Sequence, residues 1–364
     1  MVDRLGNEID FRIVTLDRDS GTNIPYSDIL HGEWNAVGLA QVFYFQPRRV
    51  SIRKLVKLFN DVRPDVVYLN SFFDNTFTQR ILWARRVGLL GNVSVILAPR
   101  GEFSSGALNL KRIKKMIYLR FAKTFSLSAD LVWHASSEQE RENLLRTLDF
   151  VRDKDVRVAM NLAPVEEQLE IAHKKRSNIE PLHVCFLSRI SPMKNLDYAL
   201  KVLMQVKSPV IFTIYGPKEI TAYWEKCESL IASCPENIQV IYEGEVHPQL
   251  VKPTLAQHDL FFFPTRGENY GHVIHEALAA GLPVLISDQT PWNEVKRRDI
   301  GWVFPLNSFE LFAEAIQEAS NWTAEQRETI ARRAQLFAIE KTTDSDVFIR
   351  NRDLFINPIE GVNP

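Results

Sequence analysis

Short apolar, β-branched segments recur along the whole chain, and longer amphipathic segments separate them. Strands that alternate with helices in this way form βαβ units, which assemble into parallel sheets. Phe261, Phe262 and Phe263 form part of a near-continuous apolar run. Such a run is typical of a strand that helices cover on both faces. The pattern therefore predicts an α/β fold.

The predicted strands fall into two series. The first comprises residues 11–16, 65–69, 94–98, 131–134 and 156–160, and the second comprises 183–189, 210–215, 238–242, 260–264, 283–287 and 301–304. A chain of 364 residues is too long for one ordinary hydrophobic core. We therefore expect an N-terminal domain over residues 1–165, a charged linker over 166–181 and a C-terminal domain over 182–341. A final helix over 342–364 is expected to pack back on the first domain.

Composition excludes several classes of function. The 44 basic residues are balanced by 45 acidic residues, so the overall charge gives no support for nucleic-acid binding. Cys185, Cys227 and Cys234 lack the paired spacing of a zinc site and are too few for a disulfide framework. The sequence has neither an apolar signal segment nor an apolar run long enough to cross a membrane. We therefore expect a cytoplasmic protein.

The stretch 264–284 carries the most specific chemistry. A strand ending at Pro264, a loop with two glycines and a helix beginning near Gly271 predict an anion site, because N–H groups at a helix start face the loop. Glu268 lies in the loop, and Glu276 lies about one and a half turns into the helix. One carboxylate can then meet hydroxyls near the loop and the other can meet hydroxyls beyond a phosphate. Two surface glutamates on a solvated helix are the alternative.

Two cations and a glycine follow other strands of the second series. Arg189 and Lys194 could offset the charge that gathers on a leaving diphosphate, although an exposed basic loop would look the same. Gly216 is either a donor-facing turn or an ordinary glycine between a strand and a loop.

In the first series, Arg100 and His134 follow or end predicted strands. Arg100 could meet a donor phosphate, an anionic acceptor or a structural ion-pair partner. His134 could equally be a core or rim histidine. Asp17 and Asp19 form a D-x-D pair after a strand, as in a metal-dependent transferase, but Arg189 and Lys194 can supply the charge instead. We therefore expect no metal ion.

These segments together resemble the family 4 retaining glycosyltransferases, which have the GT-B fold of two Rossmann-like domains facing across a cleft. The stretch with Glu268 and Glu276 resembles the E-x7-E motif of that family, and residues 186–197 resemble its basic diphosphate motif. Residues 287–294 and 301–302 also look family-like. Residues 98–103 and 133–138 resemble its acceptor-side segments, and the resemblance extends over residues 8–345.

The resemblance implies sugar transfer from a nucleotide diphosphate sugar to a glycan or lipid-linked acceptor, without a cofactor or metal ion, in surface polysaccharide synthesis. It implies catalytic roles for Arg189, Lys194 and Glu268. The implied acceptor-side residues are Arg100, Gly101 and His134. The implied donor-binding residues are Gly216, Gly244, Val246, Asn269, Tyr270, Gly271, His272, Val273 and Glu276. A GT-B nucleotide-sugar epimerase, or an inactive homologue that only binds nucleotide, remains open.

The start of the chain departs from the family pattern. Family members usually begin with a strand and a glycine-rich loop, whereas residues 1–10 lead almost directly into 11–16, which resembles the second strand of the family. We therefore expect the first domain to lack its first strand and residues 11–16 to form a buried strand that needs neighbours on both sides.

Two basic stretches accompany apolar residues in the first domain. One runs from Lys111 to Lys123, and the other contains Arg48, Arg49, Arg53, Lys54 and Lys57. Solvated helix faces explain both stretches. The alternative is docking on anionic lipid headgroups at the inner face of the membrane, which suits an enzyme with a lipid-linked acceptor.

Overall fold

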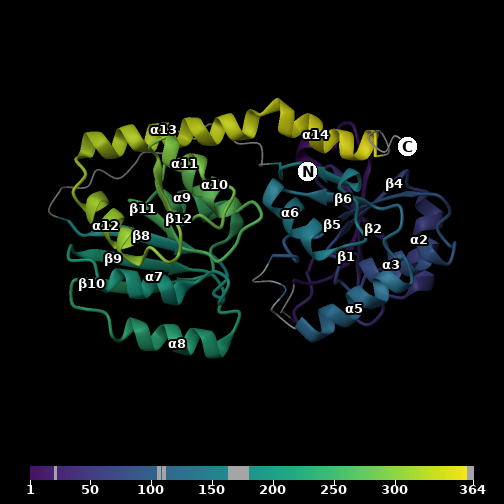
Figure 1. Ribbon diagram of the computed structural model, residues 1–364, viewed down its shortest axis with the longest axis horizontal. Coiled ribbons are helices and arrows are strands. Elements are labelled where there is room, and N and C mark those ends of the chain that lie inside the picture. The colour runs from purple at the N-terminus through teal and green to yellow at the C-terminus, as the bar shows by residue number, and fades with distance from the viewer. Residues whose placement is uncertain (20–22, 105–107, 109–111, 163–179, 359–364) are drawn as a thin grey trace. The chain divides into compact units, whose positions relative to one another are not determined.

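A computed structural model describes residues 1–19, 23–104, 108, 112–162 and 180–358. Most of the predicted linker, residues 166–179, and Lys111 lie outside this described part. The chain divides into two compact units, shown in Figure 1. Unit 1 comprises Met1–Val165 with Asp344–Pro364, and unit 2 comprises Glu166–Thr343.

Unit 2 is built on a six-stranded parallel sheet with the order β10-β9-β8-β11-β12-β13. Its strands are β8 (Leu182–Leu187), β9 (Val210–Tyr215), β10 (Ile238–Gly244), β11 (Leu260–Phe263), β12 (Val284–Ser287) and β13 (Gly301–Phe304). Its α-helices are α7 (Leu196–Leu203), α8 (Thr221–Ile231), α9 (Val251–Leu255), α10 (His272–Ala279), α11 (Glu294–Arg297), α12 (Phe309–Ser320) and α13 (Ala324–Thr343). The second series of predicted strands is therefore confirmed.

Helices cover both faces of this sheet. Figure 1 shows α7 and α8 on one side and α10 and α13 on the other. Phe261, Phe262 and Phe263 are fully buried, because alternate side chains of a strand point to opposite faces and both faces are covered. A parallel sheet places the carboxyl ends of all its strands at one edge. The loops after β8, β9, β10, β11 and β12 therefore share the carboxyl edge of unit 2.

Unit 1 contains two separate sheets. The first has the order β1-β3-β2, and the second is parallel with the order β4-β5-β6-β7. The strands are β1 (Phe11–Leu16), β2 (Trp34–Val37), β3 (Ala40–Phe45), β4 (Val66–Asn70), β5 (Ser94–Ala98), β6 (Val132–Ala135) and β7 (Val156–Val158). The α-helices are α1 (Val2–Leu5), α2 (Ile52–Val62), α3 (Thr78–Arg86), α5 (Arg112–Thr124), α6 (Glu138–Thr147) and α14 (Ser345–Ile356).

The two faces of the second sheet pack against different helices. Leu69 and Leu97 belong to a core that α2, α3, α5 and α6 also enter and that extends to Phe45 of the first sheet. Tyr68, one residue from Leu69 and so on the opposite face, packs with Phe355 of α14 at a ring distance of 5.5 Å. The segment after Thr343 therefore packs on unit 1.

The expectation of a buried strand over residues 11–16 is wrong. In the part of the chain that the structure describes, strand β1 pairs only with β3, and Arg12 and Ile13 are exposed. Its apolar residues are only partly covered: Val14 and Leu16 contact the core on one face, and Phe11 meets Phe355 edge-on at 5.7 Å on the other. Among the described residues, no helix is long and apolar enough to span a membrane.

Candidate functional site

The site in unit 2 begins where β8 and β11 lie side by side at the centre of the sheet. The chain leaves these two strands in loops that end in α7 and α10. On one side of β8 the sheet continues to β9 and β10, and on the other it continues to β11, β12 and β13. Such a change of direction creates a crevice at the carboxyl edge, where open α/β sheets bind ligands.

Backbone and side-chain hydrogen bonds join these two loops. The Asn195 side chain donates to the Pro264 carbonyl at 2.9 Å and accepts from Arg266 at 3.0 Å. The Arg266 amide donates to the Met193 carbonyl at 2.8 Å. Asn195 is buried and has a left-handed backbone with φ of 64°. The two loops therefore form one connected structure.

An ion pair between Lys194 and Glu268 lies within this structure. The Lys194 ammonium contacts the Glu268 carboxylate, and the two side chains are only 15% and 14% exposed. The Glu268 amide donates to the Gln289 carbonyl at 2.9 Å, which adds the loop after β12. Lys194 and Glu268, for which the resemblance implies catalytic roles in two different motifs, are thus in direct contact.

Arg189 lies elsewhere in the same region. Its guanidinium donates to Glu219 at 2.8 Å, and its side chain is 64% exposed. Glu219 belongs to the loop after β9, so Arg189 connects the β8 and β9 loops. Arg189 and Lys194 therefore have separate partners.

The remaining donor-side candidates follow β9, β10 and β11. Gly216 has φ of 124°, and a Cβ atom there would lie 2.0 Å from the Ser188 carbonyl oxygen. The Gly216 amide also donates to the Gly244 carbonyl at 2.7 Å. This close approach gives Gly216 a packing role whether or not a donor touches it. Val246 lies two residues beyond the end of β10 and is half-buried.

Helix α10 begins after Gly271, as predicted. Gly271 has φ of 78°, and His272 and Val273 are the first two helical residues. A helix start presents N–H groups that lack acceptors within the helix, together with the positive end of its dipole. Asn269 and Tyr270 form the approach to this helix, and the buried Tyr270 packs on Trp292 at 5.3 Å.

Glu276 lies further along α10 and is half-buried. A full helical turn separates its position from Gly271. Glu268 and Glu276 therefore occupy a loop and a helix respectively, as the sequence predicted.

The acceptor-side candidates gather at the carboxyl edge of the second sheet of unit 1. Arg100 donates to the side chains of Asn70 at 3.0 Å and Tyr68 at 2.9 Å, and also to Asn161. All three partners are neutral, and Arg100 forms no ion pair with any other described residue. Its charge is therefore not offset by a carboxylate in the described part of the chain.

His134 holds Tyr68 rather than facing a ligand. It is 1% exposed, and its Nε2 donates to the Ala159 carbonyl at 2.7 Å. Burial lowers the pKa of His134 to about 4, so the ring is neutral at pH 7 and Nδ1 must accept from the Tyr68 hydroxyl at 2.6 Å. Burial also raises the pKa of Tyr68 to about 12. Direct contact between His134 and an acceptor does not fit this burial, and the histidine positions Arg100 through Tyr68.

The buried carboxylate of Glu140 and the half-buried carboxylate of Glu102 fix the loops around Arg100. Glu140 accepts from the Gly101 amide and from Ser136, while Glu102 accepts from the Phe72 amide at 2.6 Å. Burial raises the pKa of Glu102, partly offset by these hydrogen bonds. The Gly101 amide is thus already engaged within unit 1.

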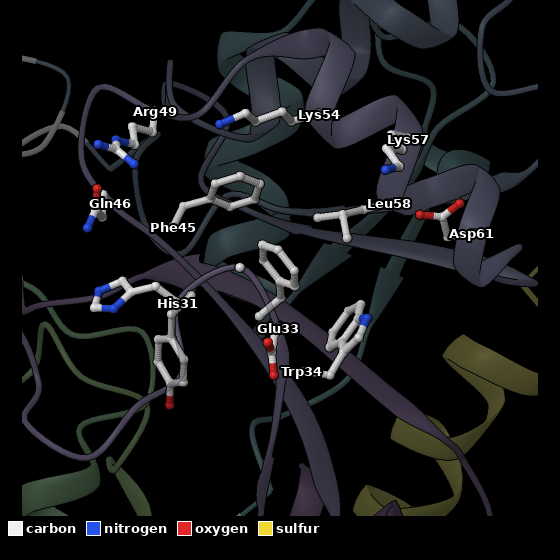
Figure 2. Close-up of a pocket in the computed structure, with 13 residues that line it drawn as sticks. His31, Glu33, Trp34, Phe45, Gln46, Arg49, Lys54, Lys57, Leu58 and Asp61 are labelled. Atoms are coloured by element: carbon white, nitrogen blue, oxygen red, sulfur yellow. The ribbon is translucent and has the colours of Figure 1, made fainter.

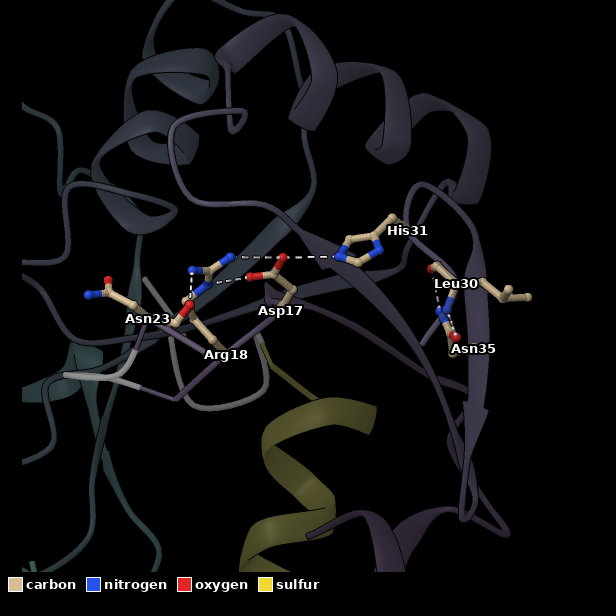
Figure 3. A network of polar contacts seen from close by, with 6 residues as sticks. All are labelled: Asp17, Arg18, Asn23, Leu30, His31 and Asn35. Atoms are coloured by element: carbon tan, nitrogen blue, oxygen red, sulfur yellow. Dashed lines mark hydrogen bonds and ion pairs between the residues drawn. The ribbon is translucent and has the colours of Figure 1, made fainter. Parts of the chain in front are cut away.

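Asp17 and Asp19 have different partners. Asp17 is buried and accepts from Arg18 at 2.7 Å and from His31 at 3.0 Å, as Figure 3 shows. The hydrogen bond from Arg18 lowers the pKa of the Asp17 carboxyl, and the one from His31 adds to this effect against burial. Asp19 instead accepts from the Tyr26 hydroxyl at 2.6 Å. Among the described residues, no group of three or more metal-ligating side chains comes together.

Several residues that shape these sites escaped the sequence analysis. In unit 1 they are Tyr68, Asn70, Glu140 and Asn161, and in unit 2 they are Asn195, Thr265, Ser287 and Gln289. Asn70 and Ser287 are the last residues of strands, and Thr265 and Gln289 lie two residues beyond a strand. A position at a strand end is the signal in the sequence that could have singled out these four.

Several solved structures have the same architecture as this chain. HepE of Anabaena in complex with UDP-glucose has a TM-score of 0.64 and 20% identity, over 86% of this chain and 84% of HepE. Sucrose-phosphate synthase from Thermosynechococcus elongatus has a TM-score of 0.66 and 14% identity, over 96% of this chain and 89% of its own. The fold is that of the GT-B glycosyltransferases.

Sequence comparison finds a similar family over the second half of the chain. Residues 167–337 match the family described as "Glycosyl transferases group 1". This part of the chain is therefore similar to the group 1 glycosyltransferases, which confirms the resemblance seen in the motifs.

Two curated relatives match at lower coverage. An uncharacterized 41.2 kDa protein in the cps region of Klebsiella pneumoniae is 25% identical over 237 residues, 64% of this chain and 62% of that protein. An uncharacterized glycosyltransferase of Methanocaldococcus jannaschii is 21% identical over 217 residues, 56% of this chain and 54% of that protein. The match thus spans little more than half the length of these relatives.

Proposed function

We propose that the chain transfers a hexose-type sugar from a nucleotide diphosphate sugar to a glycan or lipid-linked acceptor, with retention of the anomeric configuration. The observation that carries this proposal is the Lys194–Glu268 pair at the centre of the carboxyl edge, beside the start of α10. The family of residues 167–337 and the UDP-glucose complex of HepE support a nucleotide-sugar donor. The cps-region relative supports a role in surface polysaccharide synthesis.

In the proposed mechanism, Lys194, Arg189 and the N–H groups near Gly271 bind the diphosphate. As the bond between the anomeric carbon and the phosphate oxygen breaks, negative charge gathers on the departing diphosphate, and these preorganised groups stabilise it. The acceptor oxygen then bonds to the anomeric carbon on the same face, and its proton passes to the leaving phosphate. Glu268 orients the sugar through its hydroxyls.

The nucleoside is assigned to Glu276, whose carboxylate accepts from the ribose hydroxyls in this proposal. Glu276→Ala is expected to weaken the affinity for UDP by about 1.5–3 kcal/mol, the range for a hydrogen bond to a charged group. Calorimetric titration with UDP measures this change. Glu318→Ala, on the exposed surface of α12, is the matched control and should bind UDP as the wild type does.

Because Lys194 and Arg189 supply positive charge, we propose that the reaction needs no metal ion. The same titration should give equal affinities with and without EDTA. Binding that EDTA abolishes and manganese restores would direct attention to Asp17 and Asp19.

Two other outcomes would favour the alternative functions. Conversion of the donor sugar without any acceptor would favour an epimerase, and UDP binding without turnover would favour an inactive homologue.

We also propose that unit 1 docks on the inner face of the membrane through α5. Ile113, Met116 and Ile117 are 77%, 58% and 65% exposed, and their spacing places them on one face of the helix. Exposed basic residues border these side chains: Arg112 precedes Ile113, and Arg120 lies on the same face about one turn beyond Met116 and Ile117. An exposed apolar stripe bordered by cations is the arrangement of helices that lie in the interface of an anionic membrane.

Replacing Ile117 with aspartate tests this docking. Loss of one buried isoleucine and addition of a negative charge should lower partitioning onto phosphatidylglycerol vesicles by about tenfold or more. Sedimentation with these vesicles and with phosphatidylcholine vesicles measures the effect. Ile349→Asp, at a 48% exposed isoleucine on α14, should bind as the wild type does. Equal binding by Ile117→Asp would contradict the proposed docking face.

A further inference from the structure

A pocket of about 620 Å³ lies within unit 1, between α2, β3 and the residues around the start of β2. Figure 2 shows Lys54 and Lys57 on one side of it, Glu33 and Trp34 on the other, and Phe45 and Leu58 between them. Its volume lies in the range of pockets that hold small-molecule ligands. None of the donor-side candidates contributes to it, because all of them belong to unit 2.

Aromatic rings form much of the pocket wall. Trp34 and Phe43 meet edge to face at 5.5 Å, and Phe43 and Phe45 lie 5.0 Å apart. Trp34 and Phe43 are only half-buried, so part of their surface is open to a ligand. The face of an aromatic ring carries negative charge and attracts polarised C–H groups, such as those on the flat side of a sugar ring.

The positively charged residues that line the pocket outnumber the negatively charged ones. Arg49, Lys54 and Lys57 carry three positive charges, and none of them forms an ion pair with another described residue. Glu33 and Asp61 carry two negative charges in the same lining. The fixed charges therefore leave one net positive charge, which matches a ligand with a single acidic group. The carboxylates can accept hydrogen bonds from hydroxyl groups of the same ligand.

The loop that leads into β2 is held in place independently of any ligand. His31, which lines the pocket, contacts the buried carboxylate of Asp17 at 3.0 Å (Figure 3). Asn35 accepts from the Leu30 amide at 2.8 Å and donates to the Leu30 carbonyl at 2.9 Å. A wall fixed in this way costs a ligand little conformational entropy on binding.

We propose that this pocket binds an acidic saccharide residue, a sugar with one carboxylate such as a uronic acid, within the acceptor glycan. The proposal rests on the proposed glycosyltransferase function and names the class of its acceptor. Aromatic surface, carboxylates and cations together suit a ring with hydroxyls and one acidic group. A polyphosphate would meet too little net charge, and a membrane surface would need apolar groups that project outward, as on α5.

The test compares two oligosaccharides of similar length by saturation-transfer NMR and calorimetry. One is a tetrasaccharide that alternates glucuronic acid with N-acetylglucosamine, and the other is the neutral tetramer of N-acetylglucosamine. The acidic tetrasaccharide should bind about tenfold more tightly or better. Lys54→Ala and Lys57→Ala should each weaken its binding roughly three- to fivefold, the scale of one exposed ion pair, and the double variant about tenfold.

Arg53→Ala is the matched control, because Arg53 is an exposed cation of the same helix that does not line the pocket. It should bind the acidic tetrasaccharide as the wild type does. UDP affinity, which reports on unit 2, should be unchanged in every variant. Equal binding of both oligosaccharides, binding of neither, or an equal loss in Arg53→Ala would overturn the proposal. Loss of vesicle binding in the lysine variants with oligosaccharide binding intact would also overturn it. A wild-type chain that binds the acidic tetrasaccharide but never transfers sugar would contradict the proposed function alone.

Discussion

Replacing Lys194 with alanine is expected to slow sugar transfer by roughly 10²–10³-fold, the scale for removing one preorganised group that stabilises developing charge. Lys194 is largely buried and held beside Glu268, so its ammonium is fixed before a substrate arrives. Charge on the diphosphate increases as the glycosidic bond breaks. The loss should therefore appear mainly in kcat and only weakly in the affinity for the donor.

Two controls separate this effect from a loss of structure. Lys207→Ala removes an exposed lysine of the same unit and should retain the wild-type rate. Lys194→Ala leaves Glu268 without its partner, so its melting temperature must be compared with that of the wild type. Wild-type turnover in a folded Lys194→Ala protein would show that Lys194 does not stabilise the diphosphate. Arg189→Ala should have a smaller effect, because the Arg189 side chain is 64% exposed and that of Lys194 only 15%.

Replacing Gly216 with alanine should destabilise unit 2 by roughly 3–5 kcal/mol, the upper end of the range for single substitutions. The new Cβ would lie 2.0 Å from the Ser188 carbonyl oxygen, a backbone atom that cannot move without disturbing the end of β8. The φ of 124° adds strain, because this backbone conformation is essentially limited to glycine. Urea unfolding followed by circular dichroism measures the difference in free energy of unfolding.

Gly244 provides the matched control for backbone strain. It has φ of 81°, and a Cβ atom there would meet nothing within 4 Å. Gly244→Ala should therefore cost only about 1 kcal/mol, the cost of a left-handed alanine. Equal costs at the two positions would show that the approach of Gly216 to Ser188 is not the cause.

The strands of unit 2 could be predicted because each is a compact apolar run between helical segments. Strands β11 and β12 are buried on both faces, so their sequences contain almost no polar residue. The hairpin of β2 and β3 was missed, because its two short strands flank Gly38 and neither is buried on both faces. Strand β2 has only four residues, two of them exposed, and leaves a weaker signal than a continuous apolar run.

The sequence predicted which loops carry the residues of the candidate site, but it did not predict which of these residues contact one another. Glu268 and Gly271 could be placed on a loop and at a helix start because a strand, glycines and a helical pattern follow in order. The pairing of Glu268 with Lys194 joins residues far apart in the sequence. This pairing depends on β8 lying beside β11. The order of strands in a sheet cannot be predicted from the local sequence of each strand. The links through Asn195 and Met193 depend on the same neighbourhood.

Hydrogen exchange with and without UDP tests the central claim most directly, that the carboxyl edge of the unit 2 sheet binds the nucleotide diphosphate. Amide protection should increase in residues 188–195, 214–217, 244–246 and 264–276, which contain the loops around Lys194 and Glu268 and the start of α10. The six-stranded sheet itself should change little, because its strands are already hydrogen-bonded to one another. Protection confined to unit 1, or no change in these segments at a UDP concentration that saturates calorimetric binding, would contradict the assignment of the donor site.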